Sequence, residues 1–201
     1  MELGIKIYYK GNLAGETVVK NKIGCRLYSG ANLAHLQQLT HLFGPGDVEQ
    51  IQFPPLSSAI METVHRGLLL QWENNNIVAT RYCRAHVYAS TAAQPLVRGE
   101  PTRVFDYELF LAGLAECKLN HAPLPVYEVF FGFGQQPSTT STVDPAVPIT
   151  VSLTHLTAKA SISRMGSAQE VNLSAENEED LLAIHLQRMV LQTQQMVPTS
   201  Q

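Results

Sequence analysis

The feature that most constrains the fold is a series of short stretches in which apolar and polar residues alternate between turn signals. Leu3, Ile5 and Ile7 alternate with polar or small residues at the start of the chain. Similar stretches occupy residues 16–20, 25–28, 48–53, 68–72, 77–90, 126–133, 149–153 and 171–173. A period of two predicts strands with one buried face, and the almost wholly apolar run 126–133 predicts a central strand.

Helical patterns are fewer and do not alternate regularly with the strands. They cover residues 57–66, 105–116, 154–165 and 178–195. In the second of these, Asp106 stands near the start, and Leu109, Phe110 and Leu114 are expected to face inward. The pattern predicts an α+β fold: a mostly antiparallel β-sandwich with flanking helices and a C-terminal helix. We expect one domain over residues 1–201, with a core of about 3–191 and a tail of 192–201.

Composition excludes some function classes. The formal net charge of -3 and the pI of about 6.1 argue against non-specific nucleic-acid binding, which depends on neutralising phosphates. Cys25, Cys83 and Cys117 are odd in number and lack CxxC spacing, so reduced thiols in an intracellular protein are expected. No signal peptide or membrane-spanning run is visible, which favours the cytoplasm or nucleus and no membrane contact.

Sequence motifs for catalysis are missing. The chain has no GxSxG, HExxH, P-loop or dinucleotide fingerprint. The glycine-containing run 132–135 lacks a third glycine and reads as the end of a strand. The histidines show no metal-ligand spacing with cysteines. We therefore expect no enzyme activity, no catalytic residues, no metal and no cofactor.

The most unusual stretch is ATRYCRAHVYAS at residues 79–90, which concentrates positive charge on a predicted strand. Alternation would place Arg84 and His86 on one face with two tyrosines, while Cys83 faces the core. Arg81 would then lie at a strand end or bulge that lets its guanidinium reach water. One reading is a plain solvated face. The other is an anion site, because the face lacks interleaved acids and Arg and His donors suit phosphate or carboxylate.

Residues in the next loop could join such a site. Arg98 and Arg103 follow this stretch closely and could close over the same patch.

Several stretches, taken together, resemble the C-terminal association domain of the interferon regulatory factors. They are YYKGNLAGETV at 8–18, GCRLY at 24–28, LFGPGDVEQIQFP at 42–54, HRGLLLQ at 65–71, ATRYCRAHVY at 79–88, VFDYELFL at 104–111 and FFGFGQ at 130–135. The resemblance covers about residues 3–191. No single stretch is diagnostic of the family, and the resemblance depends on the order and spacing of all of them together.

The resemblance implies a Smad- and FHA-like sandwich that dimerises and docks phosphorylated partners without catalysis. The implied partners are family members in homo- or heterodimers, a phosphorylated adaptor, or other transcription factors such as STAT or Ets types. The family's DNA-binding domain, marked by spaced tryptophans, is separate, and Trp72 is the only tryptophan here. DNA binding is therefore expected only through a domain absent from this sequence, in a protein of cytoplasm and nucleus.

In innate-sensing members of the family, a basic surface receives a phosphoserine that follows a Leu-x-Ile stretch. The resemblance assigns Arg81, Arg84 and His86 to that surface, with Lys10 and Arg164 as further basic positions. A lysine that some members carry in the next loop has no clean match here, and Glu100 falls near its position, so Arg98 or Arg103 would have to substitute for it.

The C-terminal stretch departs further from the family pattern. Glu176 occupies the phosphoserine position, and it either replaces the phosphate or, with the acids that follow, only caps the last helix. Regulation could instead fall on Ser167 or Ser174. The apolar face of the last helix packs on its own domain or on a partner; its residues are Leu182, Leu186, Met189 and Val190.

Two other interpretations remain open from the sequence. One keeps a phosphopeptide-binding sandwich but places it outside transcription. The other is a small intracellular hydrolase or ligand-binding sandwich, which would require a deep apolar pocket with convergent polar groups.

Overall fold

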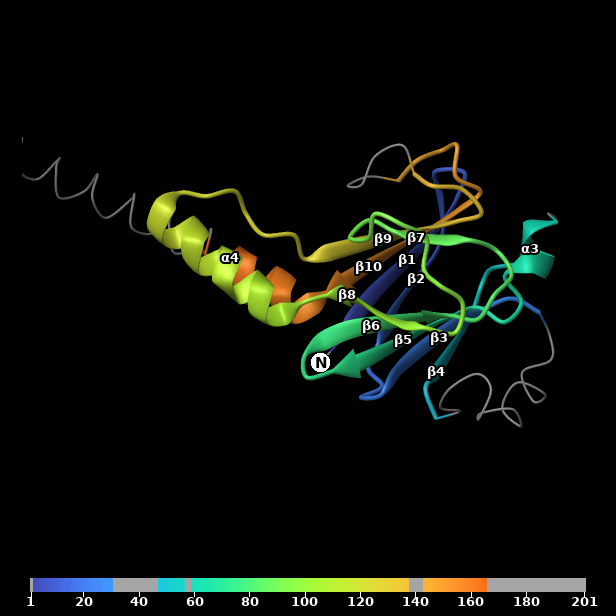
Figure 1. Ribbon diagram of the computed structural model, residues 1–201, viewed down its shortest axis with the longest axis horizontal. Coiled ribbons are helices and arrows are strands. Elements are labelled where there is room, and N and C mark those ends of the chain that lie inside the picture. Colours follow the sequence, from blue (N-terminus) through green and yellow to red (C-terminus); the bar gives the residue numbers. More distant parts are fainter. Residues whose placement is uncertain (1, 31–46, 57–58, 138–142, 166–201) are drawn as a thin grey trace, which may run out of the picture. The chain divides into compact units, whose positions relative to one another are not determined.

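The computed structural model describes residues 2–30, 47–56, 59–137 and 143–165. The chain divides into two compact units, Met1–Lys159 and Ala160–Gln201. The first unit holds two five-stranded sheets, and the predicted mostly antiparallel sandwich is confirmed (Figure 1). The predicted strand at 171–173 and helix at 178–195 lie outside the described residues.

The first sheet is antiparallel and has the strand order β2-β1-β10-β9-β7. Its strands are β1 (Leu3–Tyr9), β2 (Asn12–Val19), β7 (Val87–Ala89), β9 (Glu128–Phe133) and β10 (Ile149–His155). The second sheet has the order β4-β3-β5-β6-β8, and only its β3–β4 pair is parallel. Its strands are β3 (Gly24–Tyr28), β4 (Glu49–Gln52), β5 (Leu68–Glu73), β6 (Asn76–Arg81) and β8 (Pro101–Phe105).

The core lies between the sheets. The alternating residues Leu3, Ile5 and Ile7 are buried as predicted, and their partners in β10 are buried too. The ring of Phe53, just after β4, meets that of Phe133 edge-on with centroids 5.4 Å apart, so the two sheets are in direct aromatic contact. β9 lies inside its sheet between β10 and β7, in line with the central strand expected for that apolar run.

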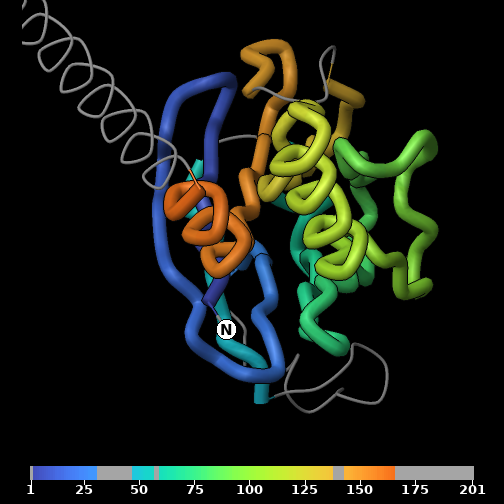
Figure 2. The backbone as a smooth tube through the Cα atoms, turned by 90° about the vertical axis from the view of Figure 1, so that its left-hand side faces the viewer, coloured from blue at the N-terminus to red at the C-terminus, as the bar shows by residue number. Residues whose placement is uncertain are grey.

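Helices lie at the two ends of the sheets within this unit. The short helix α3 (Ile60–Thr63) stands at one end, and α4 (Tyr107–Asn120) at the opposite end (Figure 1). Figure 2 looks onto the end that carries α4. The helix predicted at 57–66 is therefore a single turn among the described residues. A further helix begins at residue 156 and continues to 165, the last described residue.

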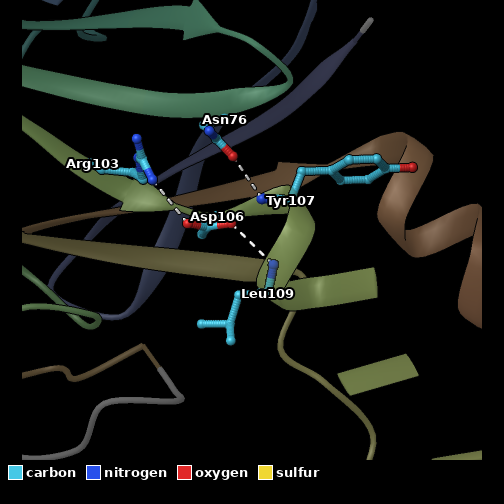
Figure 3. A network of polar contacts seen from close by, with 5 residues as sticks. All are labelled: Asn76, Arg103, Asp106, Tyr107 and Leu109. Atoms are coloured by element: carbon cyan, nitrogen blue, oxygen red, sulfur yellow. Dashed lines mark hydrogen bonds and ion pairs between the residues drawn. The ribbon is translucent and has the colours of Figure 1, made fainter. Parts of the chain in front are cut away.

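The start of α4 shows why its boundary was predictable. The Asp106 side chain accepts a hydrogen bond from the Leu109 N–H at 3.0 Å, an N-cap, and its other oxygen pairs with Arg103 (Figure 3). Asn76 accepts the N–H of Tyr107 at 2.8 Å and ties the helix to β6. Phe110 and Leu114 are buried as expected, but the inward prediction for Leu109 is wrong, because its side chain is 73% exposed.

Candidate functional site

The basic stretch 79–90 is not one strand, so that prediction is wrong. Its first residues end β6 in the second sheet, its later residues form β7 in the first sheet, and residues 82–86 cross between them. The predicted alternation of exposure nevertheless holds, with Arg84 and His86 exposed and Cys83 buried.

Backbone hydrogen bonds hold this crossing segment against the last residue of α3 and the turn that follows it. The carbonyl of Gly67 accepts the N–H groups of Tyr82 and Cys83, each at 3.0 Å. The carbonyl of Thr63 accepts those of Arg84 and Ala85, at 2.8 and 3.1 Å. Four main-chain hydrogen bonds therefore fix the crossing segment, and they fix the position of the Arg84 backbone from which its side chain extends.

Gly67 is the residue that lets the chain turn here. Its φ is +71°, a left-handed conformation that glycine adopts at low cost. A Cβ at this position would come within 1.7 Å of the Leu27 carbonyl oxygen, so the backbone of β3 leaves no room for a side chain.

Three arginines from three separate segments line one cavity of about 370 Å³ beside α3. Arg66 comes from the turn after α3, Arg84 from the crossing segment and Arg98 from the loop before β8. Glu62, Thr63 and His65 complete the lining. The cavity is thus mainly cationic, and planar guanidinium groups suit phosphate or carboxylate ligands.

Arg98 is held in position by its neighbours. Its Nε–H donates to the carbonyl of Tyr82 at 3.2 Å, and the Gly99 N–H donates to the carbonyl of Arg81 at 2.8 Å. Arg98 itself is exposed. Its guanidinium is therefore oriented on the wall of the cavity while keeping donors available to a ligand.

Arg81 does not reach water as predicted. Its residue is only 9% exposed, and its Nη1 donates to the carbonyl of Ala85 at 2.8 Å. Its Nε has no hydrogen-bond partner among the described residues. The side chain braces the crossing segment from within and is not among those that line the cavity.

The remaining predicted basic residues lie in other places. Arg103 pairs with Asp106 at 3.0 Å beside α4, and the bonds from Leu109 and Arg103 lower the pKa of the Asp106 carboxyl. Lys10 occupies the β1–β2 turn, and its N–H donates to Pro148. His86 is exposed, and its carbonyl accepts the Gly134 N–H. Strand register places Lys10 and His86 at the same end of the first sheet, three strands apart.

The other predicted positions follow residue 159. Arg164 belongs to the second unit and is exposed in the helix 156–165. Those outside the described residues are Ser167, Ser174, Glu176, Leu182, Leu186, Met189 and Val190.

The two buried cysteines, Cys25 and Cys83, are poor nucleophiles. Burial raises the pKa of Cys83 to about 11, although Arg81 and Arg98 partly oppose the shift. Burial also raises the pKa of Cys25 well above its usual value. Both thiols stay protonated near neutral pH, and a protonated thiol is a poor nucleophile.

Sequence reasoning missed four of the six residues that line the cavity: Glu62, Thr63, His65 and Arg66. His65 and Arg66 begin the HRGLLLQ stretch, whose last four residues are the start of β5. The ring of His65 lies against Gly30, where an added Cβ would be 2.8 Å from its Cδ2. A second cavity of about 680 Å³ adjoins the first and shares Glu62 and His65 with it. Its apolar wall consists of Phe53, Pro55, Leu56 and Met61.

Among the described residues, no group of three or more metal-ligating side chains comes together. In the same part of the chain, no helix has the length and apolar character needed to cross a membrane.

Comparison with known proteins gives the family. Residues 1–165 match the family model described as "IRF-3: Interferon-regulatory factor 3". The chain belongs to the interferon regulatory factor family. Members of this family are transcription factors and not enzymes.

Relatives of known sequence agree with this assignment. Mouse interferon regulatory factor 5 is 28% identical over 155 residues, covering 67% of this chain and 31% of its own length. Human interferon regulatory factor 8 is 28% identical over 154 residues, covering 67% of this chain and 35% of its own length. The chain thus spans about a third of the length of these relatives.

Solved structures agree with the fold. The association (IAD) domain of interferon regulatory factor 9 superposes with a TM-score of 0.64 at 18% identity, covering 86% of this chain and 91% of that one. A structure of STAT2 in complex with interferon regulatory factor 9 matches with a TM-score of 0.62 at 19% identity, covering 81% and 95%. The expected Smad- and FHA-like association-domain fold is therefore confirmed.

Proposed function

We propose that this chain is the protein-interaction and dimerisation domain of an interferon-regulatory-factor transcription factor, and that it docks a phosphorylated or acidic segment of a partner. The observation that carries the proposal is the convergence of Arg66, Arg84 and Arg98 on one cavity. Main-chain hydrogen bonds to Thr63 and Gly67 already hold the crossing segment in place. Less conformational entropy of this segment is therefore lost when a ligand binds.

A phosphoserine suits this cavity better than a neutral side chain. Its charge of about -1.5 to -2 and its three acceptor oxygens match several guanidinium donors at once. His86, two residues beyond Arg84 and also exposed, extends the basic surface along the partner segment. Arg81 supports this surface from beneath, and Arg103 is occupied by Asp106.

The partners we propose follow from the family. They are other family members in homo- or heterodimers, a phosphorylated adaptor, or another transcription factor, as in the complex of STAT2 with interferon regulatory factor 9. DNA binding would come from a separate domain of the whole protein. Interferon regulatory factors act in the cytoplasm and nucleus generally, and we propose the same compartments here.

Calorimetry with the 201-residue chain tests the proposal. The ligands are a peptide carrying Leu-x-Ile-phosphoserine and its unphosphorylated twin. We expect binding only of the phosphopeptide, weakened about tenfold or more in Arg84→Ala and in Arg98→Ala, the scale of one lost charge-assisted bond. The Arg84→Ala/His86→Ala double variant should bind more weakly still.

Arg103→Ala is the matched control, because it removes an equal charge from an exposed arginine that lies beside α4. Its affinity for the phosphopeptide should equal that of the wild type. Equal binding of both peptides, or equal losses in Arg84→Ala and Arg103→Ala, would refute docking in the cavity.

A further inference from the structure

The arginine cavity contains one acid. Glu62 is the single carboxylate among its lining residues, and it is exposed on α3. The ion pairs Lys6–Glu16 and Arg103–Asp106 lie away from the cavity, and Glu62 belongs to neither of them. The wall therefore presents several cationic side chains and one exposed carboxylate.

Glu62 also marks the passage to the second cavity. It and His65 line both cavities, whereas the three arginines line only the first. His65 is seated against Gly30, which limits where its ring can move. A peptide that places an anion among the arginines and continues into the larger cavity must pass the Glu62 carboxylate.

We propose that Glu62 is a specificity-determining residue, and that the cavity takes a segment in which a phosphoserine has a lysine or arginine close by in sequence. This inference rests on the proposed function. A bound phosphate beside Glu62 is repelled by it, and a ligand cation placed against the carboxylate removes that cost. Discrimination then comes partly from repulsion of the wrong ligand.

The same reasoning disfavours an all-acidic occupant. The segment 175–180 of this chain carries Glu176, Glu178, Glu179 and Asp180. Bound in the cavity, it would bring further negative charge against Glu62. A phosphorylated partner segment with a neighbouring base is therefore the better match to this wall.

A double-mutant cycle between protein and peptide tests the inference. The proteins are the full chain and its Glu62→Gln variant. The peptides are phosphoserine peptides in which a single lysine is moved through the three positions before and the three after the phosphoserine, each with a matching glutamine version. At one or more positions, wild type should bind the lysine version about three- to fivefold more tightly, the scale of one partly exposed ion pair. In Glu62→Gln that preference should disappear.

Glu73→Gln is the matched control. Glu73 is an exposed acid at the far end of β5 from Leu68, which pairs with Arg81 at the cavity end. This variant should keep the lysine preference, because the charge it removes is distant from the cavity. A preference lost equally in both variants would show a general charge effect and would overturn the role of Glu62.

Other outcomes are equally decisive. If no lysine position is preferred, or if the preference persists in Glu62→Gln while phosphate-dependent binding remains, the inference fails and the proposed function stands. If no peptide binds in a phosphate-dependent way, both fail. A peptide of residues 174–181 that binds wild type more tightly than every lysine phosphopeptide would also overturn the inference, in favour of the chain's own acidic segment.

Discussion

His155 should make the stability of this domain depend on pH. It is 2% exposed, and its ring is stacked on Tyr107 with centroids 5.0 Å apart and lies 4.9 Å from Phe105. It is also the N-cap of the helix that begins at residue 156, because its Nδ1 accepts the Ala158 N–H at 3.1 Å. A protonated Nδ1 can no longer accept that bond.

Burial lowers the pKa of His155, with the backbone of Asn75 and His155 opposing the shift in part. The unfolded chain, with a histidine pKa near 6.5, therefore binds more protons than the folded chain over the interval below about 6.5. The free energy of unfolding should fall as pH falls through this interval. The free energy of unfolding changes by at most about 1.4 kcal/mol per pH unit for this one group, and the change stops below the pKa that His155 has in the folded protein.

Urea unfolding between pH 7.5 and 5, followed by circular dichroism, measures this slope. His155→Asn is the informative variant, because asparagine still provides a cap oxygen but does not titrate. The chain has 7 histidines, and the others can also contribute to the pH dependence. The comparison is therefore between the slopes of unfolding free energy against pH in the variant and in the wild type, and not between their stabilities at one pH. The variant should lose most of the acid-side slope. A slope equal to that of the wild type would refute the assignment to His155.

Three further perturbations test the framework around the site. Asp106→Ala removes the cap of α4 and should lower the free energy of unfolding by about 1 kcal/mol, whereas Glu108→Ala, an exposed acid in the same turn, should change it little; urea unfolding measures both. Gly67→Ala would place a methyl group against the Leu27 carbonyl and would require alanine to adopt a left-handed backbone conformation. The free energy of unfolding should therefore fall by about 2 kcal/mol or more; thermal unfolding measures this, and an unchanged melting temperature would contradict it. Arg81→Ala should lower stability by about 2 kcal/mol by removing the bond to Ala85, yet leave phosphopeptide affinity of the folded protein unchanged by calorimetry; a large affinity loss with intact folding would place Arg81 in the binding surface.

Local patterns predicted the sandwich well, because most strands bury one face and follow a period of two. β1 shows this directly, with Leu3, Ile5 and Ile7 all buried. β8 was missed: it is a short edge strand that opens with Pro101, a residue that cannot donate to a ladder. An edge strand needs partner bonds on one side only, so its sequence carries a weak signal.

The candidate site was predictable only in part. Exposure of Arg84 and His86 followed from alternation, and that pattern survives in the crossing segment even though the segment is not a strand. The crossing itself depends on the carbonyls of Thr63 and Gly67, which are distant in sequence. For the same reason, Arg66 could not be assigned to the cavity before the fold was known, and Arg81 could not be recognised as buried.

The most direct test of phosphate docking is to observe the arginine side chains by NMR. The full chain would be titrated with the Leu-x-Ile-phosphoserine peptide while the Nε–H signals of Arg66, Arg84, Arg98 and Arg103 are followed. We predict that the three cavity signals shift with the phosphopeptide and not with its unphosphorylated twin, while Arg103 stays in place. If the Arg84 and Arg98 signals do not shift, or if they shift equally with both peptides, phosphate docking at this cavity is contradicted.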